Sequence, residues 1–211
     1  MPKRALSIND IYNSRFQKMY FENEYKDSFG TPERAGVWIC WGQSGHGKTR
    51  FMLKLAKYLT NYGRVAYDTL EEGLSLSFQK ACIDSNMNQV RKGSFIILDR
   101  EPIEELKLRL RKKRSPDIII IDSFQYTGMS KKEYKELKEE FNNKLFIFVS
   151  HASGRLPEGK VADFVRYDSD IKIYIEGYKA FPKSRMGGSK EFIIWQQGAM
   201  DYWGLKTSKN E

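Results

Sequence analysis

The sequence has few of the residues from which disulfide frameworks, zinc-type metal centres and membrane spans are built. Two cysteines and two histidines occur in 211 residues, and their spacing fits no metal-ligand motif. Cys40 lies in an apolar run, where a buried and unreactive thiol is expected. The uninterrupted apolar runs are only a few residues long, whereas a membrane-spanning helix needs about 20. Because no apolar stretch follows Met1 as it would in a secretory signal, we expect a cytoplasmic protein without membrane association.

The sequence is rich in positive charge and in aromatic rings. The formal net charge is +9, and aromatic residues make up 14% of the chain. With 40% hydrophobic residues, this composition predicts an ordinary packed core and, at this length, one main domain. The charge favours an anionic partner, of which nucleic acid is the commonest, although a basic protein without such a partner has the same composition.

Strand-like and helix-like segments alternate along the chain. Apolar, often β-branched runs predict strands at 37–41, 64–69, 94–98, 118–121 and 145–150, and short strands in hairpins at 171–175, 178–181 and 192–195. Helical spacing predicts helices at 7–25, with a capping box from Ser7 to Asp10, and at 48–61, 74–91, 102–113 and 130–143. This order predicts an α/β fold, with a mostly parallel sheet flanked by helices and C-terminal antiparallel hairpins. We divide the chain into an N-terminal helical segment and linker (1–35), a core (36–203) and a polar tail (204–211).

A phosphate-binding motif follows the first predicted strand. The segment Gly42-Gln43-Ser44-Gly45-His46-Gly47-Lys48-Thr49 fits the pattern G-x-x-x-x-G-K-S/T and stands directly before a predicted helix. In such a loop, glycines let successive amide groups point at an anion, and the helix N-terminus adds partial positive charge. Lys48 would reach the β- and γ-phosphates, and the Thr49 hydroxyl would bind Mg²⁺. The alternative is a chance glycine-rich turn, but the strand–loop–helix context favours a site for MgATP.

Acidic residues follow two of the other predicted strands. Asp122 comes directly after the run of four isoleucines at 118–121, where a Mg²⁺-binding carboxylate is expected. Glu71 and Glu72 come just after the predicted strand 64–69. Because the ends of parallel strands converge on one crevice, either glutamate could orient or deprotonate an attacking water. The alternatives are a capping role for Asp122 and a solvated acidic turn at Glu71 and Glu72.

These motifs together resemble the RecA-like P-loop ATPases, a superfamily that includes RecA and RadA recombinases, DnaB-type helicases and KaiC. The resemblance covers residues 36–196 and rests on the phosphate loop and four further segments: Thr69-Leu70-Glu71-Glu72, Ile121-Asp122-Ser123-Phe124-Gln125, Leu145 to His151, and Pro182-Lys183-Ser184-Arg185-Met186-Gly187-Gly188. It implies a catalytic role for Glu71, with Glu72 as second choice, and contacts to the nucleotide region by Gln125, Ser150 and His151. The match at His151 is looser, because relatives often have glutamine there, and a structural histidine is the alternative.

The same resemblance implies an oligomer with ATP at subunit interfaces. In the family, the lysine and arginine that match Lys183 and Arg185 reach the γ-phosphate of a neighbouring subunit. A ring or filament of identical chains is therefore expected, unless these residues form only an exposed basic turn. Single-stranded DNA is the expected partner of loops 126–132 and 151–168, which carry aromatic and basic residues: Tyr126, Lys131, Lys132, Arg155, Lys160 and Arg166. A lid or a subunit contact is the alternative for the long second loop.

The sequence thus predicts a Mg-dependent ATPase that acts on or with DNA as a helicase-like motor or loader in recombination or replication. A KaiC-like module, in which ATP controls assembly without nucleic acid, is the main alternative. A P-loop kinase acting on a small molecule or nucleotide is a weaker one, since Glu71, Lys183 and Arg185 suit water as the acceptor. A GTPase is disfavoured because Asn143-Lys144 is followed by Leu145-Phe146 and not by a base-reading aspartate.

Overall fold

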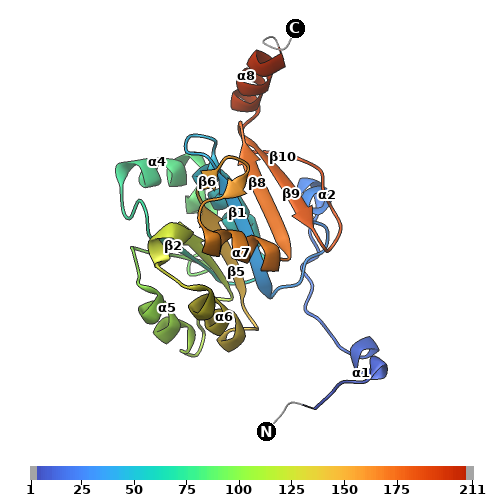
Figure 1. Cartoon of the computed structure of the whole chain (residues 1–211). Coiled ribbons are helices and arrows are strands. Elements are labelled where there is room, and N and C mark those ends of the chain that lie inside the picture. Colours follow the sequence, from blue (N-terminus) through green and yellow to red (C-terminus); the bar gives the residue numbers. More distant parts are fainter. Residues whose placement is uncertain (1–3, 208–211) are drawn as a thin grey trace.

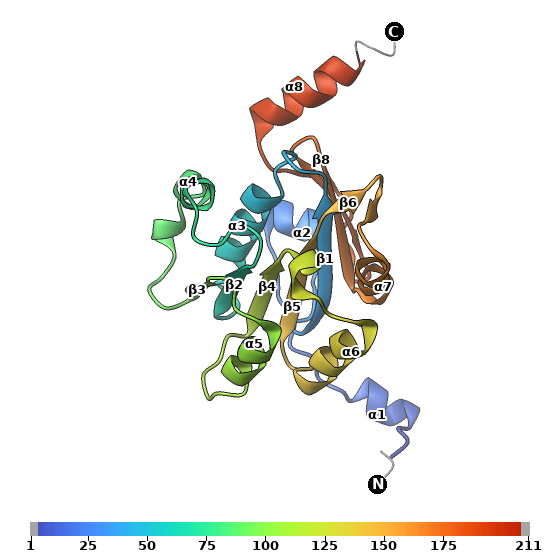
Figure 2. The ribbon, with the colours of Figure 1, turned by 60° about the vertical axis from the view of Figure 1, so that its left-hand side comes forward.

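An eight-stranded sheet forms the centre of the computed structural model, which describes residues 4–207 (Figures 1 and 2). The strand order is β10-β9-β8-β1-β5-β4-β2-β3. The six strands from β8 to β3 are parallel, and β9 and β10 extend the sheet in antiparallel fashion beyond β8. The bounds are β1 Gly36–Gly42, β2 Val65–Thr69, β3 Phe95–Leu98, β4 Ile118–Asp122, β5 Leu145–Ser150, β8 Ile171–Glu176, β9 Lys179–Ser184 and β10 Phe192–Ile193. The predicted α/β class and the antiparallel C-terminal strands are confirmed.

Helices cover both faces of this sheet. The helices are α1 Ile8–Tyr12, α2 Asn23–Phe29, α3 Lys48–Leu59, α4 Leu76–Asp84, α5 Ile103–Leu110, α6 Lys131–Glu140, α7 Lys160–Asp168 and α8 Gln196–Thr207, with 3-10 turns at Met87–Gln89 and Phe124–Thr127. Apolar residues of α2, α3 and α4 share one buried cluster, and those of α5, α6 and α7 share another. In Figures 1 and 2, α1 and α8 project away from opposite ends of the sheet. No helix of residues 4–207 combines the length and the hydropathy needed to cross a membrane.

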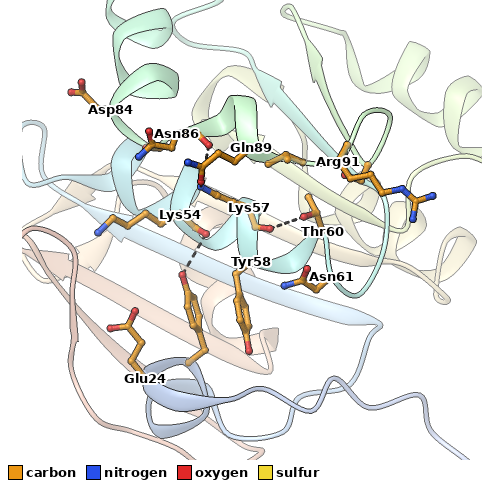
Figure 3. Close-up of a pocket in the computed structure, with 14 residues that line it drawn as sticks. Glu24, Lys54, Lys57, Tyr58, Thr60, Asn61, Asp84, Asn86, Gln89 and Arg91 are labelled. Atoms are coloured by element: carbon orange, nitrogen blue, oxygen red, sulfur yellow. Dashed lines mark hydrogen bonds between the residues drawn. The ribbon is translucent and has the colours of Figure 1, made fainter.

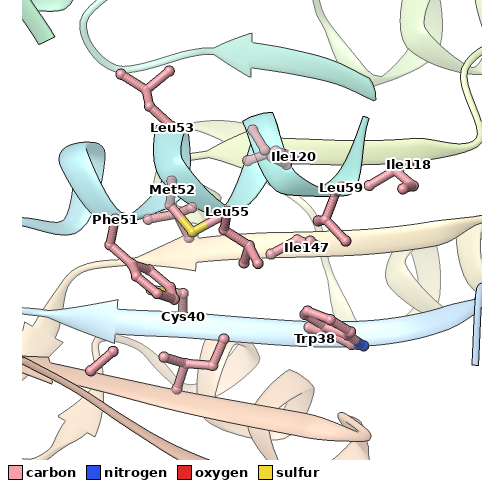
Figure 4. Close-up of a cluster of buried hydrophobic side chains, with 14 of the residues drawn as sticks. Trp38, Cys40, Phe51, Met52, Leu53, Leu55, Leu59, Ile118, Ile120 and Ile147 are labelled. Atoms are coloured by element: carbon pink, nitrogen blue, oxygen red, sulfur yellow. The ribbon is translucent and has the colours of Figure 1, made fainter. Parts of the chain in front are cut away.

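The alternation of side chains along the central strands builds both clusters. In β1, Trp38 and Cys40 face α3, as Figure 4 shows, whereas Val37, Ile39 and Trp41 face the other layer. The isoleucine run of β4 divides in the same way and is fully buried. Burial of each large apolar side chain stabilises the fold by about 1.5–3 kcal/mol. The unbroken apolar runs therefore mark strands that are covered on both faces.

The N-terminal helix predicted over 7–25 is wrong beyond its first turn. The capping box of Ser7 and Asp10 starts α1, but the helix ends at Tyr12. Met19 and Phe21 are buried while Tyr20 between them is exposed, which is the alternation of an extended chain. Backbone bonds from Met19 to Pro32 and from Arg34 to Gln17 hold this stretch. The apolar residues at 7–25 thus belong to two short helices joined by an extended segment.

The long loop predicted over 151–168 is also wrong. It contains a small hairpin, β6 Ala152–Ser153 with β7 Leu156–Pro157, followed by α7. Ala162 and Val165 of α7 are buried against the sheet, and these two small apolar residues among charged ones gave only a weak helical pattern. At other ends the helices are shorter than predicted, with α4 ending at Asp84 and α5 at Leu110. The C-terminal helix α8 was not predicted and runs across the proposed boundary at 203; residues 208–211 lie outside the described residues.

Candidate nucleotide-binding site

The phosphate loop connects β1 to the N-terminus of α3, as its motif predicts. Gly47 has a φ of 95°, which L side chains rarely adopt, and no side chain caps α3 behind it. The amide groups of the first turn are therefore left for an anion. The ammonium group of Lys48 donates to the carbonyl oxygen of Gln43 over 3.0 Å, which holds it against the loop. Gly42 is needed for close packing, because a Cβ there would lie 2.4 Å from the carbonyl oxygen of Ile175. The arrangement fits a triphosphate.

The ends of β2 and β4 bring the predicted acidic residues to the same region. Asp122 is paired in register with Thr69, and its Oδ2 accepts a hydrogen bond from the hydroxyl of Tyr67. Burial raises the pKa of Asp122 to about 6, against the hydrogen bond from Tyr67, and the nearby Glu71 carboxylate adds to the rise. No described residue donates to Oδ1 of Asp122 or to the hydroxyl of Thr49. These are oxygen ligands of the kind Mg²⁺ takes, so the residues present fit the ion.

Glu71 is held beside the end of β4 by backbone and side-chain bonds. Its amide group donates to the carbonyl oxygen of Asp122 over 3.2 Å. Its Oε2 lies 2.8 Å from Nε2 of His151, whose Nδ1 lies 3.5 Å from Oε2 of Glu158. The Ser123 hydroxyl is 3.4 Å from the same Nε2. The structure therefore brings Glu71 and His151 together at the ends of β2 and β5.

Gln125 connects this cluster to the hairpin β6–β7. Its amide nitrogen donates to the hydroxyl of Ser150 over 2.7 Å and to the carbonyl oxygen of Glu158 over 2.9 Å. Its amide oxygen accepts from the backbone N–H of His151 over 3.2 Å. All the polar groups of the Gln125 side chain are thus used to fix the end of β5. Gln125, Ser150 and His151, predicted as one group, lie together.

Glu72 points to a different place. Its Oε2 accepts hydrogen bonds from Ser77 over 2.9 Å and from Ser75 over 3.5 Å, at the start of α4. Ser75 is itself the N-cap of α4. Glu72 thus supports the first turn of α4, and the geometry favours Glu71 over Glu72 as the group next to a nucleotide.

His46 and three tyrosines add contacts that the motifs did not reveal. Nδ1 of His46 accepts from the backbone N–H of Gly177 over 3.1 Å, and its carbonyl oxygen accepts from that of Tyr178 over 3.2 Å. Its ring packs edge-on to Tyr202 of α8, with centroids 5.2 Å apart. The phosphate loop is thereby fastened to the β8–β9 turn and to α8. The roles of Tyr67, Tyr178 and Tyr202 depend on register and on a helix that the sequence pattern did not show.

Lys183 and Arg185 lie at the other end of the sheet. Lys183 is paired in register with Lys172 near the start of β8, and a guanidinium nitrogen of Arg185 is 3.7 Å from Oδ1 of Asp170. Asp170 precedes Ile175, the partner of Gly42 in the phosphate loop, by five residues. At about 3.3 Å per residue, this separation is about 16 Å along the strand. Within one chain, these two residues are therefore not brought to the phosphate loop.

The largest cavity among the described residues lies elsewhere. It has a volume of about 820 Å³ and lies between α2, α3 and the segment after α4 (Figure 3). Its lysines are already occupied, because Lys54 donates to the carbonyl oxygen of Ile194 over 2.6 Å and Lys57 to Asn86 and Gln89. Glu24 and Asp84 add negative charge to its wall. Volume alone thus does not mark an anion site here.

Comparisons with known proteins agree with this geometry at the level of the fold. No protein-family model matches the sequence, and no curated protein is similar to it. Among solved structures, flagellar accessory protein FlaH from Methanocaldococcus jannaschii superposes with a TM-score of 0.59 at 17% identity, over 83% of this chain and 91% of that one. The ATPase domain of a DnaB-like helicase gives a TM-score of 0.54 at 17% identity, over 76% and 81%. The chain has the fold of the RecA-like P-loop ATPases.

Proposed function

We propose that the chain binds MgATP at the phosphate loop and hydrolyses it. The observation that carries this proposal is the uncapped N-terminus of α3, which stands next to Lys48 and to the carboxylate of Asp122 at the end of β4. In the proposal, the loop amides and Lys48 bind the phosphates, and Thr49 and Asp122 hold Mg²⁺. The bound ion would neutralise phosphate charge.

Glu71 is proposed to accept the proton of the attacking water, or to orient it. The bond to His151 fixes one oxygen of its carboxylate and leaves the other to face the water. His151 in turn connects Glu71 to Gln125 and the hairpin, so a change at the phosphates can be passed to the surface. Ser150 and Gln125 hold His151 in position.

The proposed assembly is a ring or filament of identical chains. Lys183 and Arg185 lie about 16 Å from the phosphate loop of their own chain along β8, which supports a role at the site of a neighbour. There a fixed guanidinium would stabilise charge that develops on the transferred phosphoryl group.

We further propose that ATP turnover is coupled to single-stranded DNA, in recombination or replication. The net charge of +9 and the exposed Tyr126 beside the hairpin support this part. A second candidate is an ATP-controlled assembly module without nucleic acid. It is favoured by the likeness to FlaH, which is described as a flagellar accessory protein and is covered over 91% of its length.

ATP turnover with and without single-stranded DNA tests the proposal. The parent chain is expected to hydrolyse MgATP, to be stimulated by the DNA, and to lose stimulation steeply with salt. Glu71→Gln is expected to bind MgATP normally and to hydrolyse it about 10²–10⁴ times more slowly. Turnover that ignores DNA over a wide salt range, together with nucleotide-dependent assembly, would support the second candidate. Absence of MgATP binding to the parent would refute both.

A further inference from the structure

A groove beside the hairpin β6–β7 contains a row of aromatic rings. It has a volume of about 440 Å³ and lies on the sheet face opposite α3, between the hairpin, β8 and β9. Trp41, Tyr174, Phe181 and Trp203 follow one another along it, with centroids of successive rings 5.9, 6.4 and 5.9 Å apart. The indole of Trp41 donates to the carbonyl oxygen of Arg155 over 3.1 Å and so ties the hairpin to this row. Figures 1 and 2 both place the hairpin and α7 next to β8.

The groove is strongly positive. Arg155, Lys172 and Lys183 line it, and none of them forms an ion pair or side-chain hydrogen bond within the part of the chain that the structure describes. The pKa of Lys172 is lowered, first by burial and then by the charges of Arg185 and Arg166, so cations are crowded here. Glu176 is the acidic residue among the lining residues, and it accepts a hydrogen bond from the hydroxyl of Tyr202 over 3.0 Å.

The larger cavity of Figure 3 provides a contrast. Its lysines are bonded to carbonyl and amide oxygens, and acidic side chains share its wall. The smaller groove has cations without acidic partners and exposes ring faces between them. Unpaired cations attract phosphate, and aromatic faces stack on bases without regard to sequence. A ligand that offers both at short intervals is a single-stranded nucleic acid.

We propose that single-stranded nucleic acid binds in this groove, with bases against Tyr174 and Phe181 and phosphates along Arg155 and Lys172. The inference rests on the proposed coupling of ATP turnover to DNA. It moves the contact from the hairpin and loop alone to strands β8 and β9. Because the hairpin carries Arg155 and is fixed at its base by Gln125, the groove is joined to the nucleotide cluster through residues already described.

Binding of a labelled oligothymidylate to the full chain, followed by fluorescence anisotropy over a salt series, tests the proposal. Tyr174→Leu keeps an apolar side chain and removes the ring face, and is expected to weaken binding about 5- to 150-fold. The double variant Arg155→Gln with Lys172→Gln is expected to lower the slope of log affinity against log salt by about 1.4. Lys80→Gln removes an exposed charge on α4, on the other side of the sheet, and is expected to match the parent. Thermal unfolding of each variant confirms that it is folded.

The outcomes separate this inference from the proposed function. If the parent binds the oligonucleotide and all folded groove variants bind equally well, the groove assignment is overturned and the coupling to DNA stands. If the parent binds none, the DNA part of the proposed function fails, and the groove assignment fails with it. If Tyr174→Leu weakens binding of a fluorescent ATP analogue and leaves oligonucleotide binding intact, the groove serves a nucleotide at a subunit contact and the proposal is wrong.

Discussion

Glu71 and His151 lie 80 residues apart in the sequence and share a hydrogen bond 2.8 Å long. The motif at 69–72 predicted that a glutamate stands near the phosphates, but it did not separate Glu71 from Glu72. The side-chain bonds make the difference, because Glu72 is engaged by serines of α4 whereas Glu71 faces His151. Such choices depend on side-chain directions after a strand end, which a sequence pattern does not contain.

Removal of the imidazole tests whether His151 positions Glu71. His151→Ala leaves the carboxylate of Glu71 without its fixed partner, and small misplacements of a catalytic group can cost about 10²-fold in rate. We expect kcat for ATP to fall about 10- to 100-fold with the Kd for MgATP unchanged. Glu158→Gln, which alters only the longer contact of His151, is the control and should keep most of the rate. Equal rates for His151→Ala and the parent would exclude the positioning role.

Asp68 provides a pH-dependent prediction. It is fully buried at the end of β2, where Oδ1 accepts from the amide of Glu101 over 3.1 Å and Oδ2 has no partner among the described residues. Burial raises its pKa to about 7 from an ordinary 3.8. Between these two values the folded chain binds more protons than the unfolded chain, so this group reduces stability as pH rises through the window.

Asp68→Asn should therefore stabilise the protein at high pH and not at low pH. We expect a gain of about 1–2 kcal/mol in the free energy of unfolding at pH 8, after allowing for the unpaired amide that replaces Oδ2. At pH 4 the gain should vanish or reverse, because the aspartate is then neutral in the folded chain. Urea unfolding at the two pH values measures this, with Asp99→Asn as the exposed control. A pH-independent difference would show that the carboxyl does not titrate in this window.

At the scale of elements, the sequence predicted what is covered on both faces. The isoleucines of β4 and the apolar run of β5 gave the sheet centre, and the phosphate motif gave the β1–α3 junction. Elements with few buried residues were missed. Only Ala162 and Val165 of α7 are buried, and α8 exposes Met200 as well as polar residues, so neither has a clear apolar stripe. Their positions come from contacts with distant residues.

The contact of α8 with the phosphate loop leads to a prediction at this scale. Tyr202 packs on His46 and over Gly177, so Tyr202→Ala should loosen the link between loop and β8–β9 turn. We expect the Kd for MgATP to rise about fivefold, which corresponds to roughly 1 kcal/mol. Met200→Ala, an exposed position on the same helix, is the matched control. Isothermal titration with an ATP analogue measures the change, and identical affinities for both variants would remove α8 from the nucleotide site.

At the scale of the whole molecule, the proposed catalytic groups are divided between two ends of the sheet. The phosphate loop, Asp122 and Glu71 stand where the parallel strands end, whereas Lys183 and Arg185 stand where β8 begins. One chain therefore presents a site that lacks a cation from outside, and a cation pair that lacks a site. Contacts of one end with the other end of an identical chain repeat without being self-complementary, which is the geometry of rings and filaments.

Mixing two inactive variants tests this division. Arg185→Ala keeps an intact phosphate loop and Glu71→Gln keeps an intact arginine, so each variant alone should hydrolyse little ATP. In random mixed assemblies, roughly a quarter of the interfaces join the intact half of one variant to the intact half of the other, and activity should rise accordingly. A mixture of Lys48→Ala with Glu71→Gln is the control, because both changes lie on the same half and no interface regains both groups. If the first mixture stays as inactive as the second while sedimentation confirms co-assembly, Arg185 does not act on a neighbour, and its contact with Asp170 is its only role.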